Sequence, residues 1–139
     1  MKIGIMGGTF NPIHNAHLLI AEMAREEYGL DRVIFITDGN PPHKSANVTA
    51  KQRFEMTHIA IADNSAFEED DFEINRSEKS YTVNTLGYLK EKYPNDDLFF
   101  IIGEDSLNDF DKWYKPDKIL EMCSLLVFPR KSLKSLTET

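Results

Sequence analysis

Short apolar runs alternate along this chain with longer segments in which apolar positions recur at helical spacing. The apolar runs have the length of β-strands, and they lie at residues 2–6, 33–37, 98–102 and 124–128. A weaker strand candidate, surrounded by acidic residues, lies at 72–74. The segments with helical spacing are 16–28, 49–62 and 82–93, with shorter helical turns at 106–111 and 116–122. Strands that alternate with helices are typical of a parallel α/β sheet.

Residues with known roles at helix ends mark where the three longer helices begin and stop. Thr49, with Gln52 three residues later, predicts a capping box at the start of the second helix. We expect Thr82 to cap the third helix and Pro94 to end it. Gly29 is expected to end the first helix.

The first strand runs directly into Gly7 and Gly8, and the helix that follows carries His14 and His17 at its start. Glycine lets a backbone approach a phosphate closely, and the first turn of a helix points unpaired N–H groups at anions. Imidazoles at i and i+3 project from one face of that turn. The pattern therefore predicts a polyphosphate site. The alternatives for the histidine pair are an ordinary surface turn, or half of a zinc site that would need a further ligand.

Three polar motifs each follow a predicted strand. They are Gly7-Gly8, the segment 41–44 with sequence Pro-Pro-His-Lys, and the segment 103–106 with sequence Gly-Glu-Asp-Ser. Parallel α/β sheets bind ligands beyond the carboxyl ends of their strands. We therefore expect these motifs to converge on one edge of the sheet.

The chain resembles a known superfamily at these same residues. Gly-Gly-Thr-Phe-Asn-Pro at 7–12, followed by His-Asn-Ala-His at 14–17, resembles the signature of the nucleotidyltransferases. Within that superfamily the resemblance is to the nicotinate-nucleotide adenylyltransferase family. Further blocks agree in order and spacing, namely 41–44, 80–86, 99–107 and Trp113, so the resemblance covers positions 2–130. It implies a Rossmann-like parallel sheet of about five strands in the order 3-2-1-4-5, with helices on both faces.

The resemblance also implies a reaction. Members of this family transfer AMP from ATP to nicotinate mononucleotide, giving deamido-NAD and pyrophosphate in NAD biosynthesis. By resemblance, His14 and His17 are the catalytic residues, which hold the phosphates and stabilise charge on the α-phosphoryl group. Mg²⁺ would be carried by the phosphates of ATP, with no metal ligands from the protein. No covalent enzyme intermediate is expected.

The resemblance assigns the other site residues to the two substrates. The residues implied to bind ATP are Gly7, Gly8, Thr9, Phe10, His17, Gly103 and Asp105. Those implied to bind the mononucleotide are His43, Lys44, Tyr81, Thr82, Trp113 and Arg130. From the residues alone, several have structural alternatives: Lys44 as a solvated surface cation, Asp105 as a helix cap and Trp113 as a core residue. Arg53 could point toward the phosphates or lie exposed in solvent.

The resemblance departs from the family at the carboxyl end. Residues 1–130 read as a single nucleotidyltransferase domain, and 131–139 as a polar tail. Relatives continue into a Ser-Ser/Thr-x-x-Ile/Val-Arg segment that the tail lacks, so we expect a truncated form. The loss of a helix would expose apolar surface and favour a homo-oligomer. Two alternatives stay open: another small-molecule nucleotidyltransferase, such as phosphopantetheine adenylyltransferase, or a nucleotide-binding module without full activity.

Length, net charge and composition restrict the expected partners and location of the protein. At 139 residues the chain is expected to form one domain, and its net charge of −7 argues against a nucleic-acid partner. No apolar run approaches the roughly 20 residues that span a bilayer, and no signal peptide precedes the first strand. Cys123, the single cysteine, is expected to be a buried structural thiol, and the acidic run 68–71 a solvated turn. We therefore expect a cytoplasmic protein with small-molecule substrates and no membrane partner.

Overall fold

The computed structural model of the chain describes residues 1–8, 10, 13, 15–39, 49–76 and 80–129. Strands and helices alternate through these residues. They are β1 (Lys2–Gly8), α1 (Asn15–Tyr28), β2 (Arg32–Thr37), α2 (Ala50–Ile61), β3 (Phe67–Asp70), α3 (Thr82–Lys92), β4 (Asp97–Gly103), α4 (Glu104–Asn108), the 3-10 helix η1 (Phe110–Lys112), α5 (Pro116–Met122) and β5 (Ser124–Phe128).

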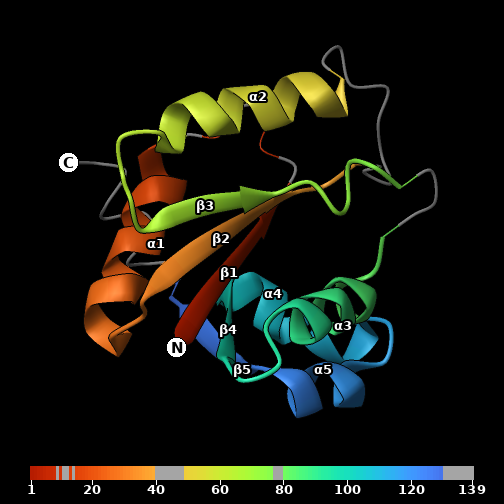
Figure 1. Ribbon diagram of the computed structural model, residues 1–139. Coiled ribbons are helices and arrows are strands. Elements are labelled where there is room, and N and C mark those ends of the chain that lie inside the picture. The colour runs from red at the N-terminus through yellow and green to blue at the C-terminus, as the bar shows by residue number, and fades with distance from the viewer. Residues whose placement is uncertain (9, 11–12, 14, 40–48, 77–79, 130–139) are drawn as a thin grey trace.

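The strands form one parallel sheet with the order β3-β2-β1-β4-β5, which confirms the order predicted from the sequence. Helices α1 and α2 cover one face of the sheet, and α3 and α5 cover the other (Figure 1). The register pairs Gly8 with Thr37 and Gly103 with Phe128, so the carboxyl ends of these strands are aligned at one edge.

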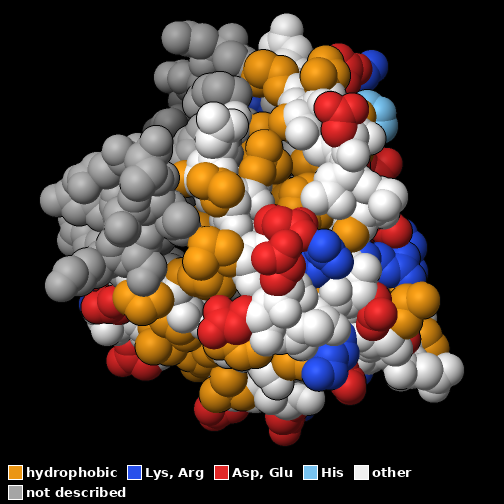
Figure 2. All heavy atoms as spheres, turned by 90° about the vertical axis from the view of Figure 1, so that its left-hand side faces the viewer, with side chains coloured by type: hydrophobic (Ala, Val, Ile, Leu, Met, Phe, Trp, Pro, Cys, Tyr) orange, Lys and Arg blue, Asp and Glu red, His pale blue; other side chains and the backbone are white. Residues whose placement is uncertain are grey.

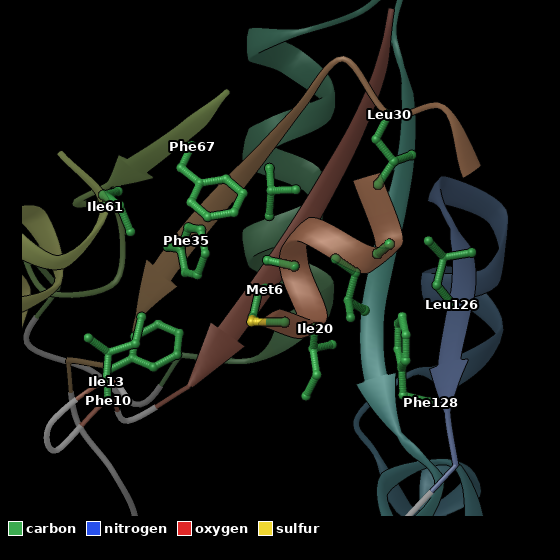
Figure 3. Close-up of a cluster of buried hydrophobic side chains, with 14 residues drawn as sticks. Met6, Phe10, Ile13, Ile20, Leu30, Phe35, Ile61, Phe67, Leu126 and Phe128 are labelled. Atoms are coloured by element: carbon green, nitrogen blue, oxygen red, sulfur yellow. The ribbon is translucent and has the colours of Figure 1, made fainter. Parts of the chain in front are cut away.

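The alternation of side chains along the strands builds a core on each face. In β2, Val33 and Phe35 pack beneath α1 and α2, whereas Ile34 and Ile36 pack beneath α3 and α5. Figure 3 shows the first of these clusters, in which Met6, Phe35 and Phe67 lie side by side across three strands. The central strands are apolar on both faces because helices cover both, as parallel sheets require.

The third strand corrects two predictions. It lies at Phe67–Asp70, not at 72–74, so the acidic run is a strand and not a solvated turn. Asp70 is 6% exposed and accepts hydrogen bonds from Tyr88 Oη and Lys92 Nζ, each at 3.0 Å. Glu68 forms an ion pair with Arg32 at 2.9 Å. Because neighbouring elements supply these partners, the carboxylates can occupy an edge strand.

Three of the predicted helix ends agree with the structure and one is wrong; α3 ends at Lys92, just before Pro94. The capping box at α2 is present, since Thr49 Oγ1 accepts from the Gln52 N–H and Gln52 Oε1 accepts from the Thr49 N–H. Gly29 follows α1 with φ +65°, a conformation that glycine adopts without steric cost. Thr82, however, is the first residue of α3 and not its cap; Tyr81 occupies the cap position, and its side chain does not cap the helix.

The face of the molecule that carries α1 is partly apolar. Figure 2 shows hydrophobic side chains gathered there beside acidic ones, and Leu19 and Met23 of α1 are 43% and 36% exposed. No helix in the described part of the chain is long and apolar enough to cross a membrane. The homo-oligomer expected from the sequence stays a prediction.

Cys123 is half-buried against the core beneath α3 and α5. Its Sγ donates to the carbonyl oxygen of Ile119 at 3.4 Å, and burial raises the pKa of the thiol to about 11. A thiol with this pKa is protonated near neutral pH and is a poor nucleophile. The structural role predicted for Cys123 agrees with this environment.

Candidate active site

Residues from the ends of three strands meet at the carboxyl edge of the sheet, where they line two adjacent cavities. Gly7 and Gly8 end β1, Asp38 follows β2, and Gly103 ends β4. The glycine turn and the start of the 103–106 motif therefore lie where the sequence predicted; segment 41–44 lies outside the described residues.

The first cavity, which we call the histidine cavity, has a volume of about 370 Å³. Its polar features are His17 from α1, Ser106 from α4 and the backbone at Gly7 and Gly103. Much of the remaining wall is apolar, with Ile101, Ile102 and Phe128 among its residues. An apolar cavity with a few polar groups at one end is the usual form of a small-molecule site.

The second cavity, which we call the acidic cavity, has a volume of about 260 Å³. Its polar side chains are Asp38, Glu73, Ser80, Thr82 and Thr85. The two cavities share a wall, because Gly7, Phe100 and Trp113 line both.

Phe10 packs between the end of β1 and His17 of the histidine cavity. It is 3% exposed and has φ +48°, and its ring meets the ring of His17 edge-on with centroids 5.2 Å apart. A Cβ at Gly8 would stand 2.9 Å from Phe10 Cε1, so the close packing of this ring requires glycine at position 8. Phe10 thus acts on the site by packing against His17 and Gly8.

Trp113 stands between the cavities. It is half-buried, and its ring packs against Phe100 and Phe110 with centroid distances of 6.0 and 5.0 Å. Ser80 Oγ, in the wall of the acidic cavity, is buried and has no hydrogen-bond partner within the described part of the chain. An aromatic ring and a buried hydroxyl without a partner suit a flat ligand that carries polar groups.

Glu73 is a residue that the sequence analysis missed. Its Oε2 accepts a hydrogen bond from Thr85 Oγ1 at 2.6 Å. Burial raises its pKa to about 7; the charge of Asp38 acts in the same direction, while the Thr85 hydrogen bond and Arg76 oppose it. Nothing in the acidic stretch around position 73 distinguishes this glutamate from the other carboxylates near it, so no signal in the sequence could have identified it.

Arg53 supports the wall of the acidic cavity. It is 2% exposed, and its Nη1 donates to the carbonyl oxygen of Asp38 at 2.7 Å. Burial lowers the pKa of the guanidinium, against the opposing charge of Asp38. The exposed alternative considered for Arg53 is therefore wrong. Beside Asp38, a Cβ at Gly39 would stand 2.2 Å from the Glu73 carbonyl oxygen, so the backbones of these two segments are in direct contact.

Replacing Glu73 with glutamine should change how stability depends on pH. Because the native pKa is about 7 against an ordinary value of 4.5, native Glu73 holds its proton over this interval and the unfolded chain does not. Wild-type stability should therefore fall as pH rises from about 4.5 to above 7, by about 3 kcal/mol in total. The measurement is the free energy of unfolding in urea at pH 5 and pH 8. Relative to wild type, Glu73→Gln should be more stable at pH 8 than at pH 5. If the difference in stability between Glu73→Gln and wild type were the same at both pH values, the prediction would be contradicted. The same change with pH in the exposed control Glu91→Gln would also contradict it.

The remaining predicted site residues fall into two groups. Thr82 lines the acidic cavity, and the ring of Tyr81 lies beside that of Tyr114 with centroids 4.6 Å apart. Asp105 is exposed in the first turn of α4, whose cap position is Gly103, so Asp105 is not a helix cap. The predicted residues outside the described part of the chain are Thr9, His14, His43, Lys44 and Arg130.

Two further features of the described residues bear on the choice of site. A hollow of about 600 Å³ lies between α1 and the start of β3, but its Glu22 is already bonded by Arg25 and Asn64. Within the described ranges no three His, Cys, Asp or Glu side chains are grouped so that they could hold a metal ion. The two cavities at the carboxyl edge are therefore the better candidate.

Known proteins are similar to this chain over most of its length. A protein from Citrifermentans bemidjiense, named "Probable nicotinate-nucleotide adenylyltransferase", is 49% identical over 142 residues, which cover 99% of this chain and 66% of the relative. A protein of the same name from Pelobacter propionicus is 51% identical over 94% of this chain and 61% of its own length. The chain thus spans less than two thirds of these relatives.

A solved structure has the same fold. The nicotinic acid mononucleotide adenylyltransferase of Plasmodium falciparum, complexed with NaAD, superposes with a TM-score of 0.81 at 23% identity, over 96% of this chain and 70% of the other. The sequence profile of the cytidylyltransferase-like family matches residues 5–139. This match confirms the resemblance to nucleotidyltransferases, and it includes the glycine turn and the residues that line both cavities. We conclude that the chain belongs to the cytidylyltransferase-like family.

Proposed function

We propose that this protein transfers AMP from ATP to nicotinate mononucleotide, forming deamido-NAD and pyrophosphate. The observation that carries the proposal is the shared wall of the histidine cavity and the acidic cavity, formed by Gly7, Phe100 and Trp113. A transfer between two nucleotides requires adjacent sites, so that the attacking phosphate lies close to the α-phosphorus. The names of the similar proteins support the same reaction.

In this proposal ATP occupies the histidine cavity. An oxygen of the acceptor phosphate attacks the α-phosphorus, and pyrophosphate leaves with its bonding electron pair. His17, which lines this cavity, stabilises the charge that develops on the α-phosphoryl oxygens, and the glycine backbone at Gly7 and Gly8 permits close approach of the phosphates. Positioning and charge stabilisation suffice for such transfers, so no protein nucleophile is required.

The acceptor then occupies the acidic cavity. Trp113 would stack on the pyridine ring, and the hydroxyls of Ser80 and Thr82 would donate hydrogen bonds to the pyridine carboxylate. By resemblance we extend the acceptor site to His43, Lys44 and Arg130, and the phosphate site to His14. These cations would offset the net negative charge of the chain at the point where two anionic substrates meet.

Mg²⁺ enters the proposal on the phosphates of ATP. Its ligands would be substrate phosphates and water, which are the usual ligands of this cation at nucleotide sites. When bound, it neutralises charge on the triphosphate. We place the reaction in the cytoplasm, where a lone thiol such as Cys123 stays reduced.

Acceptor selection tests the proposal. Pyrophosphate release with ATP and Mg²⁺ should require nicotinate mononucleotide, and phosphopantetheine should not replace it. Trp113→Ala should raise the KM for the mononucleotide by about 5- to 150-fold, since stacking on an aromatic side chain contributes about 1–3 kcal/mol. The matched control is Tyr114→Ala, whose ring is 49% exposed and lines neither cavity. Equal turnover with phosphopantetheine, or an unchanged KM in Trp113→Ala, would contradict the proposal.

A further inference from the structure

The acidic cavity has an unexpected charge for an anion site. Asp38 and Glu73 line it, and no basic side chain does so within the described part of the chain. Nicotinate mononucleotide differs from nicotinamide mononucleotide by carrying a carboxylate on its pyridine ring. Two ionised carboxyls in one partly closed cavity would repel that carboxylate. Loss of one of these negative charges would relieve that repulsion when the acid binds.

The surroundings of Glu73 allow its carboxylate to bind a proton and so lose its negative charge. From α3, Thr85 Oγ1 donates to its Oε2 at 2.6 Å, and from the end of β2 the charge of Asp38 disfavours ionisation. Arg76, on its own segment, favours ionisation; its guanidinium lies over the ring of Phe72, 5.1 Å from the centroid. Arg53 of α2 donates to the Asp38 carbonyl oxygen. With burial as the largest cause, the pKa of Glu73 is raised to about 7.

We propose that Glu73 is a specificity residue that admits the pyridine carboxylate in its neutral form, so that binding of nicotinate mononucleotide takes up one proton. The proton comes from solvent and adds to the Glu73 carboxylate; no other bond forms or breaks. Nicotinamide mononucleotide lacks the second anion and binds with Glu73 in either state. This inference rests on the proposed acceptor site.

The test is the affinity of the 139-residue chain for both mononucleotides between pH 6 and pH 9, followed by the fluorescence of Trp113, its single tryptophan. Both ligands carry the same phosphate, so the ratio of their Kd values cancels its titration. Above pH 7 the Kd of nicotinate mononucleotide, relative to the nicotinamide compound, should rise by up to about tenfold per pH unit. Calorimetry in buffers of different ionisation enthalpy should count up to one proton taken up.

Three variants test whether Glu73 causes the pH dependence of the Kd ratio. In Glu73→Gln the ratio should be independent of pH, and no proton should be taken up. Thr85→Val keeps Glu73 but removes the hydrogen bond that stabilises its carboxylate, which raises the pKa of Glu73 further. The affinity for nicotinate mononucleotide should therefore begin to fall at a higher pH than in wild type. Glu69→Gln alters a partly buried glutamate that pairs with His58 and does not line the acidic cavity, so it should behave as wild type.

The outcomes separate the two proposals. A ratio that does not change with pH in wild type, or a pH dependence that survives in Glu73→Gln, would overturn the role of Glu73 while both mononucleotides still bind. Failure of nicotinate mononucleotide to bind at any pH would instead overturn the proposed function, and this inference with it.

Discussion

Replacing His17 with alanine should lower kcat for adenylyl transfer by between about 10²- and 10³-fold. His17 is the imidazole that the structure describes in the histidine cavity, beside the backbone of Gly7 and Gly103. Removing one preorganised donor from a site of developing charge typically costs this much. The loss should appear mainly in kcat and less in the Kd of the acceptor, because the acceptor is proposed to occupy the other cavity. Steady-state rates of deamido-NAD formation measure it.

The matched control is His58→Ala. The His58 side chain is 70% exposed and pairs with Glu69 on β3, and neither residue lines either cavity. Its kcat should equal that of wild type, and both variants should keep the circular dichroism spectrum of the folded chain. If His17→Ala retained wild-type kcat, the histidine cavity would not be the site of transfer.

Replacing Gly39 with alanine should destabilise the fold by about 3 kcal/mol or more. The new Cβ would lie 2.2 Å from the Glu73 carbonyl oxygen and 2.7 Å from Ile74 Cα. Both are backbone atoms, so no side-chain rotation can relieve the clash. The segment that carries Glu73 would have to move away from β2, which would also open the acidic cavity. Urea denaturation should therefore show a lower midpoint, and acceptor affinity should fall with it.

Gly87→Ala is the matched control, since the same substitution meets open space there. Gly87 lies inside α3, and a Cβ at this position has no neighbour within 4 Å. Alanine stabilises a helix interior by about 1 kcal/mol relative to glycine, so this variant should be more stable than wild type. Equal effects of the two substitutions would contradict the close contact between Gly39 and Glu73.

The sheet and its ligand edge could be predicted from the sequence because their signals are local. The apolar run at 98–102 lies within β4, and Gly7-Gly8 falls at the end of β1. The third strand could not be predicted in this way. Acidic residues normally mark solvent, but Asp70 receives its partners Tyr88 and Lys92 from α3, far along the chain.

The candidate site likewise contains residues that the sequence indicated and residues that it did not. His17 and Thr82 lie in motifs, and the structure places them in the two cavities. Glu73 and Arg53 owe their burial to contacts between elements: Thr85 and Gly39 enclose the first, and the Asp38 carbonyl oxygen binds the second. No pattern within either segment records those contacts, so only the assembled fold shows them.

The measurement that tests the central claim most directly follows the α-phosphate of ATP. The chain is incubated with ATP labelled at that position, Mg²⁺ and nicotinate mononucleotide, and the products are separated. Direct transfer between the two cavities predicts that the label appears in deamido-NAD, in amounts equal to the pyrophosphate released and with none bound to protein. Label that remains in ATP, or that becomes attached to the chain, would contradict it.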